Sequence, residues 1–384
     1  MEKLSKEEIK NLIQSVFSTQ KNDKNLAIIV DVPDEMVPDI ENWKKRREMA
    51  EDWYEKLNLV KEKLGLEQVD IIYYQNVHSN NADLPEKAYF LKDTPRQIDA
   101  STLFSHGKSF DFQLQLSQYQ LLLAPTQFSA TAPLKLLAKK YGFRAATMPG
   151  FSEEMIPALK LDYEEINRRV NEIKEYLDDA LCIEIYFSTD EHKEYQIYFD
   201  IRFRKAHASG GRFPDPGTAG NLPSGECYIV PYEGEQEEKS LSSGIVPVQF
   251  DEEIVLYQIE ENIAKKVLSK GKKSEEETQK LIQEPAYGNI AEIGFGVLKD
   301  FGVQPIGAIL LDEKLGLHIA FGRSDHFGGA VGVKDFSIPD KVVHIDRIYI
   351  PETQNRIMPE KVVLTFEDGH KFTLMTKGEY TIFP

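Results

Sequence analysis

The sequence predicts two domains of different class, an N-terminal α/β domain with a largely parallel sheet and a β-rich α+β C-terminal domain. Three observations predict this. Short apolar runs alternate with helical stretches over residues 1–160, strictly alternating strands dominate after residue 180, and few helices follow there. We therefore place the domains at residues 1–180 and 181–384.

The N-terminal strands are near-continuous apolar runs, as is typical of strands buried on both faces of a parallel sheet. They span residues 26–32, 69–75 and 121–125, with helices expected over 40–65 and 132–141. The glycine patterns GxGxxG and GxxxxGK[ST] are absent, so nothing indicates a nucleotide-binding domain.

Residues 163–180 carry apolar side chains at helical spacing, and we expect this helix to link the two domains. An antiparallel hairpin follows, with strands over 181–187 and 195–203. Further strands are expected over 227–231, 245–250, 252–259, 342–350, 362–366 and 371–376, with one helical interlude over 261–284. The Gly- and Pro-rich segment 205–225 reads as a long loop, which is uncommon unless it is functional or mobile.

Composition limits the function classes. The 384 residues carry a net charge of −17, which argues against nucleic acid or an anionic membrane surface as a partner. Cys182 and Cys227 give no disulfide framework, and the N-terminus lacks the apolar core of a signal peptide. No apolar run is long enough to span a membrane. The lack of a disulfide framework is typical of a reducing compartment, so we expect a cytoplasmic protein.

His344 and Asp346 form the first candidate site, because residues two apart on a strand point to the same face. A carboxylate in an apolar strand must be paired or bind a cation, since burying it bare is costly. This pair alone fits a structural hydrogen bond as well as a metal site.

Three further acids interrupt apolar, glycine-containing runs of the same half. Glu226 follows the Gly/Pro segment, Glu292 lies within AEIGFG, and Glu313 precedes His318 by five residues. Four carboxylates in one pocket would repel each other, and two divalent cations would neutralise them. Ligands of carboxylate and imidazole without thiolate suit Zn²⁺, Co²⁺, Mn²⁺ or Fe²⁺, and a pair of such ions makes a hydrolytic centre.

At these residues the sequence resembles the metallo-aminopeptidases of the aminopeptidase T type, the thermophilic leucyl aminopeptidases. The matching stretches are NLPSGE at 221–226, NIAEIG at 289–294, LDE through HIAFG at 311–322, and VHID at 343–346. The resemblance implies the metal ligands Glu226, Glu292, Glu313, His318, His344 and Asp346. It also implies two ions per chain (Zn, Co or Mn), a peptide substrate and a homodimer. In a hydrolytic reaction, Glu226 or Glu292 could move the proton to the leaving amine if one of them is only loosely bound to metal.

The stretch RSDHFGG at 323–329 departs from the family, which usually has a tyrosine where Asp325 stands. His326 could replace the tyrosine as a catalytic donor, and Arg323 and Asp325 could bind substrate, Asp325 through the free amine of a peptide. The alternative is that this stretch is only a glycine-rich turn.

The leading hypothesis is therefore a two-metal aminopeptidase that hydrolyses the N-terminal peptide bond. A ring-cleaving dioxygenase of the 2,5-dihydroxypyridine type is a second possibility, since it needs one iron held by two histidines and one carboxylate. A non-catalytic, metal-binding relative is the third.

Overall fold

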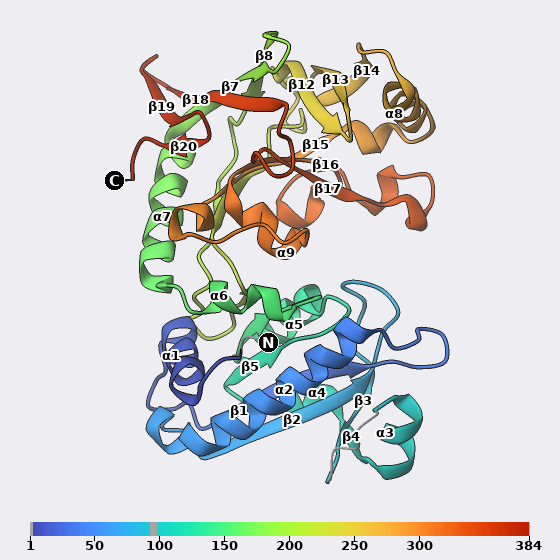
Figure 1. The fold of residues 1–384 in the computed structure, drawn as a ribbon, viewed down its shortest axis with the longest axis vertical. Coiled ribbons are helices and arrows are strands. Elements are labelled where there is room, and N and C mark those ends of the chain that lie inside the picture. Colours follow the sequence, from blue (N-terminus) through green and yellow to red (C-terminus); the bar gives the residue numbers. More distant parts are fainter. Residues whose placement is uncertain (1–2, 93–97, 384) are drawn as a thin grey trace. The chain divides into compact units, whose positions relative to one another are not determined.

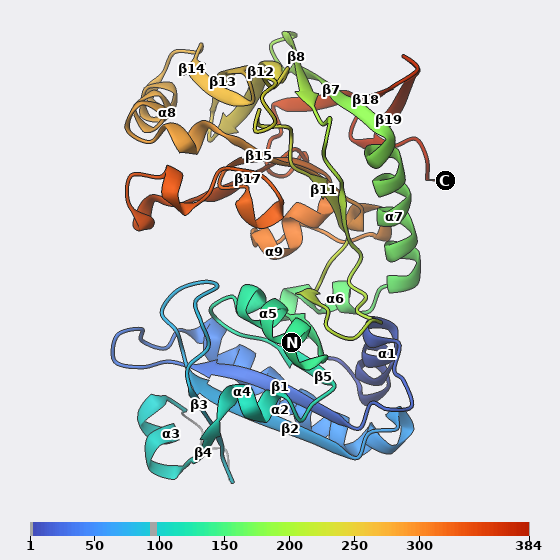
Figure 2. The same cartoon turned by 180° about the vertical axis from the view of Figure 1, so that it is seen from behind.

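The computed structural model describes residues 3–92 and 98–383, which divide into two compact units. Unit 1 comprises residues 1–167 and 211–224, and unit 2 comprises 168–210 and 225–384. Unit 1 contains a mainly parallel sheet with helices, and unit 2 contains two antiparallel sheets (Figures 1 and 2). The α/β and β-rich fold classes predicted from the sequence are confirmed.

The sheet of unit 1 has the strand order β10-β6-β5-β1-β2-β3-β4 in the described part of the chain. Strands β10 through β2 pair in parallel, while β3 and β4 add an antiparallel edge. In chain order its elements are α1 (Lys6–Phe17), β1 (Asn25–Val32), α2 (Glu41–Val60), the 3₁₀ turn η1 (Lys61–Leu64), β2 (Gln68–Gln75), β3 (Lys87–Phe90), α3 (Ala100–His106), β4 (Lys108–Asp111), α4 (Phe112–Leu116), β5 (Leu121–Ala124), α5 (Thr131–Tyr141), β6 (Arg144–Thr147), η2 (Glu153–Met155), α6 (Ile156–Leu159) and β10 (Ala219–Asn221).

Both faces of this sheet are covered, which explains why its strands are continuously apolar. One face packs alternate residues such as Ala27 and Ile29 against α4 and α5. Helix α2 packs against β1 and β2 and is drawn in front of them in Figure 1, with α4 and α5 in front in Figure 2. Removing these strands from water on both sides supplies the main driving force for this unit.

Helix α7 (Tyr163–Asp179) begins in unit 1 and continues into unit 2. The remaining elements are β7 (Ala180–Thr189), β8 (Glu194–Asp200), β9 (His207–Ser209), β11 (Glu226–Ile229), β12 (Ser243–Phe250), β13 (Glu253–Glu260), β14 (Ile263–Val267), α8 (Lys272–Gln283), η3 (Pro285–Gly288), β15 (Ile290–Gly296), η4 (Leu298–Phe301), α9 (Ile309–Asp312), η5 (Glu313–Leu315), β16 (Leu317–Gly322), η6 (Asp325–Phe327), η7 (Val333–Asp335), η8 (Pro339–Lys341), β17 (His344–Ile348), β18 (Ile357–Phe366), β19 (Lys371–Thr376) and β20 (Glu379–Tyr380).

Unit 2 holds a sheet of order β14-β13-β12-β8-β7-β18-β19-β20 and a smaller one of order β17-β16-β15-β11-β9, counted over the described residues. The predicted hairpin is present as β7 and β8. The helical interlude predicted over 261–284 is wrong in its first part, because β14 occupies Ile263–Val267 and only Lys272–Gln283 is helical. There, pairing with β13 overrides the local helical preference.

The Gly/Pro-rich segment 205–225 also contains structure that the loop prediction missed. Strand β9 pairs with β11 in the smaller sheet of unit 2, whereas β10 pairs with β6 in unit 1. Within the described part of the chain, none of the helices has the length and apolar character needed to cross a membrane.

Candidate metal centre

The candidate residues gather on one face of the five-stranded sheet of unit 2. Residues directly opposite one another in antiparallel strands share a face. Glu292 lies opposite Ala320, which lies opposite Asp346. His318 lies opposite Gly294, and His344 lies opposite Gly322. Large polar side chains and small residues therefore alternate across this face, and the small residues leave the space that the polar ones fill.

Both histidines present the same ring nitrogen to the centre. The Nδ1 atom of His318 lies 3.3 Å from the Gly316 carbonyl oxygen, and that of His344 lies 2.8 Å from the Arg323 carbonyl oxygen. A carbonyl only accepts, so Nδ1 carries the proton and donates. This fixes the ring orientation and points Nε2 inward, which is the arrangement expected of metal-binding histidines.

Glu292 joins the two histidines. Its Oε1 lies 3.3 Å from His318 Nε2, and its Oε2 lies 3.2 Å from His344 Nε2. Asp346 Oδ1 lies 3.6 Å from His344 Nε2. Two groups of ligand atoms could each hold a metal ion, and Glu292 belongs to both groups. The groups are Glu226, Glu292 and His318, and Glu292, His344 and Asp346.

The electrostatics of this cluster favour a cation. Burial would raise the pKa of Glu292, but hydrogen bonds from His318 and His344 hold it well below its usual range. Burial would lower the pKa of His318, yet Glu292, Glu226 and Asp346 raise it to about 9. The carboxylates thus favour positive charge strongly enough to outweigh desolvation of the imidazole, and a divalent ion supplies such charge.

Glu226 and Glu313 are connected through a lysine. The Lys314 ammonium donates to Glu226 Oε1 and to Glu313 Oε1, and only 1% of the lysine side chain is exposed. The other oxygen of Glu226, Oε2, is buried without a hydrogen-bond partner and lies 3.6 Å from His318 Nε2. Glu313 is outside both ligand groups, and burial raises its pKa to about 8.

The segment 323–327 lies beside His344. The His326 and His344 rings meet edge to face at 5.3 Å, and Arg323 Nε donates to Asp325 Oδ1 at 2.5 Å. Burial, together with His344 and Arg323, lowers the pKa of His326 to about 4. His326 is therefore a neutral imidazole at neutral pH, able to accept a proton at one nitrogen and donate at the other.

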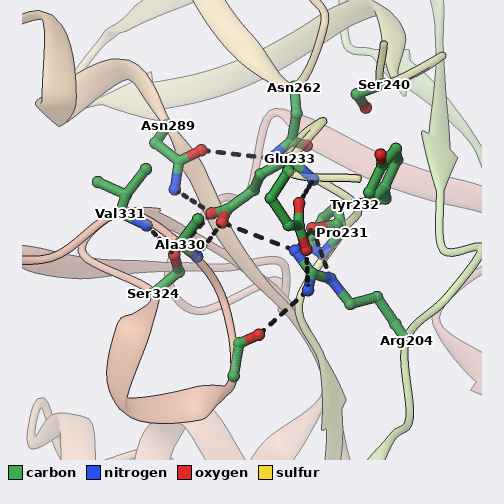
Figure 3. Close-up of polar contacts among 12 residues, drawn as sticks. Arg204, Pro231, Tyr232, Glu233, Ser240, Asn262, Asn289, Ser324, Ala330 and Val331 are labelled. Carbon is green, nitrogen blue, oxygen red and sulfur yellow. Dashed lines mark hydrogen bonds and ion pairs between the residues drawn. The ribbon is translucent and has the colours of Figure 1, made fainter. Parts of the chain in front are cut away.

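A buried carboxylate, Glu233, holds the same segment in place (Figure 3). It accepts hydrogen bonds from the Ser324 hydroxyl at 2.6 Å, the Asn289 amide at 2.7 Å and the Ala330 backbone N–H. Arg204 Nη2 lies 3.7 Å from Glu233 Oε2, and Arg204 Nη1 donates to the Gly328 carbonyl. Glu233 and Arg204 thus hold the turn that runs from Ser324 to Ala330.

The structure brings Glu226, Glu292, His318, His344 and Asp346 together and places Glu313 beside them through Lys314. Sequence reasoning missed Lys314 and Glu233. A lysine within the apolar run 308–322 was a signal for the first, since a buried ammonium needs carboxylate partners. Glu233 lies in the acidic stretch 233–238, and its sequence context does not separate it from its surface neighbours.

No protein-family model matches this chain, and no curated protein matches it significantly. The solved structures that match this chain include two that are similar over nearly its whole length. One is 2,5-dihydroxypyridine dioxygenase from Pseudomonas putida KT2440, with a TM-score of 0.59, 14% identity and 99% of both chains covered. The other is wild-type AmpT, an aminopeptidase T, from Thermus thermophilus, with a TM-score of 0.55, 14% identity and 98% of both chains covered. Because proteins with different named activities share this fold, the fold alone does not select between them.

Proposed function

We propose that this chain is a metal-dependent aminopeptidase that removes N-terminal residues from peptides at a centre of two divalent cations. One observation carries the proposal, namely that Glu292 directs one carboxylate oxygen to each of two inward-facing histidine Nε2 atoms. A carboxylate shared between two ligand groups can serve two adjacent ions. The resemblance around residues 221–226, 289–294, 311–322 and 343–346 supports the same reading.

The donor set fits Zn²⁺, Co²⁺ or Mn²⁺, since it combines imidazole nitrogens with carboxylate oxygens. Ions bound there lower the pKa of water and stabilise an oxyanion. In this proposal Asp346 and His344 complete one ion site, while Glu226 Oε2 and His318 complete the other. Glu226 or Glu292 carries the proton in this proposal, since both oxygens of Glu292 face histidines and those of Glu226 lie at Lys314 and beside His318.

Substrate handling falls to the segment 323–327. Asp325, oriented by Arg323, offers a carboxylate for the free amine of a peptide. His326, neutral and in contact with the His344 ring, takes the donor role that a tyrosine has in the family. The homodimer and the cytoplasmic location stay predictions.

Activity is tested on purified protein stripped with a chelator and reloaded with Zn²⁺, Co²⁺ or Mn²⁺. We expect release of the N-terminal residue from free peptides, no release from N-acetylated copies, and loss of turnover in Glu292→Gln. Lack of turnover with every metal on a broad peptide panel would overturn the proposal.

A second candidate is a single-iron, ring-cleaving dioxygenase. It is favoured by the two inward Nε2 atoms that share Glu292, since two histidines and one carboxylate can hold a non-haem iron. Oxygen uptake with Fe²⁺ and 2,5-dihydroxypyridine, with no peptide turnover, would select this candidate. Metal binding without either reaction would point to a non-catalytic relative.

A further inference from the structure

Lys314 is a charged group inside the candidate centre that the proposed reaction does not use. Its ammonium contacts two of the six residues proposed as ligands, Glu226 and Glu313, and is almost completely buried. We propose that Lys314 acts as a fixed internal cation that withdraws Glu313 from the metal ligands and makes the two ion sites unequal in affinity. The proposal rests on the divalent centre described under the proposed function.

Strand pairing and one glycine place Lys314 next to Glu226. Glu226 lies opposite Gly296 in the β11–β15 pair. A β-carbon at Gly296 would lie 2.2 Å from the Lys314 carbonyl carbon, so only glycine lets the turn η5 lie this close to the sheet. The close approach brings the Lys314 side chain onto the same face as Glu226.

Because of Lys314, the two ions are left with different sets of ligands. Glu292, His344 and Asp346 form one group in which no ligand contacts Lys314. In the other group, Glu226 has one oxygen bound to Lys314 and can offer only Oε2, beside Glu292 and His318. We therefore assign the tight site to the group with His344, and the weak site to the group with Glu226.

The net charge of the centre predicts the same difference in affinity between the first and the second ion. Bound divalent ions favour the ionised form of all four acids. In that form, Glu226, Glu292, Glu313 and Asp346 together with Lys314 carry a net charge of minus three. One divalent ion reduces it to minus one, and a second makes it plus one, which is unfavourable in a buried site unless an anion such as hydroxide accompanies it. Without Lys314 the same two ions would make the site neutral.

The experiment is a titration of the chelator-stripped, full-length chain with Co²⁺ alone. Binding is measured by calorimetry and by the visible absorption of bound Co²⁺. The wild type is expected to bind one ion at least about tenfold more tightly than the second, a difference of ~1.4 kcal/mol. Lys314→Met should tighten the second site by at least about tenfold. Lys314→Arg, which keeps the charge, should remain like the wild type.

Glu313→Gln is the second test of the proposal, and it leaves Lys314 in place. Because Lys314 already holds Glu313, this variant should leave the tight site within about twofold to threefold of the wild type, and the one negative charge that it removes should weaken the second site by no more than about tenfold. In the Lys314→Met background the same change should abolish the gain, because Glu313 is then free to act as a ligand.

Equal affinities in the wild type, an unchanged second site in Lys314→Met, or loss of an ion in Glu313→Gln would each overturn the proposal. If Lys314→Met fails to fold by circular dichroism, the wild-type ratio and the Glu313→Gln arm decide it. Peptide turnover is not a readout, so an inactive chain with unequal sites would overturn the proposed activity and leave this inference standing.

Discussion

The imidazole ring of His318 occupies the space that a side chain on Gly294 would need. The two residues lie opposite each other in β15 and β16, and a β-carbon at Gly294 would fall 1.9 Å from His318 Nε2. The glycine is therefore part of the centre, since it sets where the ring nitrogen points.

Gly294→Ala should displace the His318 ring and weaken metal binding. A misplaced ligand or supporting group typically costs about 10- to 100-fold in metal affinity. The measurement is a Co²⁺ or Zn²⁺ titration of the variant, with circular dichroism to show that the sheet is intact.

Gly142→Ala serves as the matched control for Gly294→Ala. Gly142 has φ +80° and open space around its missing β-carbon, so alanine there costs stability through backbone strain alone. It should leave metal affinity unchanged. Equal affinity in Gly294→Ala and the wild type would show that His318 is not a ligand.

His344→Ala should abolish binding at the site shared with Glu292 and Asp346. The reason is that His344 supplies the one imidazole of this ligand group. Elemental analysis of protein purified without chelator should find at least one ion fewer per chain than in the wild type. His370→Ala, an exposed histidine in the turn between β18 and β19, should keep the full metal content.

These ligands lie on short strands whose character the sequence predicts well. The alternation in 342–350 correctly predicts that His344 and Asp346 share a face, because a two-residue period is a local property. The continuous apolar runs of unit 1 likewise predict its parallel strands.

The remaining features depend on contacts between distant segments, which no local pattern encodes. Lys314 reaches Glu226 only because η5 packs on Gly296, and Glu233 contacts Ser324 across 91 positions of sequence. The strand at Ile263–Val267 follows from pairing with β13, which overrides its local preference. Long-range pairing of this kind had to be seen in the structure.

Glu233→Gln should loosen the segment that carries Asp325 and His326. The amide cannot accept at both positions as the carboxylate does, so the Ser324 hydroxyl or the Ala330 N–H loses its partner. Loss of a hydrogen bond to a buried charged group should lower stability by ~2 kcal/mol. If the proposed peptidase activity holds, kcat/KM should fall by about tenfold, which corresponds to ~1.4 kcal/mol in the barrier.

Metal affinity should stay unchanged in Glu233→Gln, because Glu233 is outside both ligand groups. Glu352→Gln is the control, since Glu352 is exposed, and it should change neither stability nor activity. Weakened metal binding in Glu233→Gln, with normal turnover at saturating metal, would contradict a role in substrate handling.

Removal of divalent ions should lower the thermal stability of the chain. Without cations the clustered carboxylates of Glu226, Glu292 and Asp346 repel one another, whereas an ion that binds only the folded state stabilises it. At an ion concentration of about 100 times Kd the gain is ~2.7 kcal/mol, which raises Tm by several degrees. Calorimetry with and without chelator measures this difference.

Asp346→Asn should reduce the difference in Tm because one ion site loses its carboxylate, whereas the exposed Asp368→Asn should preserve it. A wild-type Tm that is the same with chelator and with saturating Zn²⁺, Co²⁺ or Mn²⁺ would contradict a metal centre at these residues.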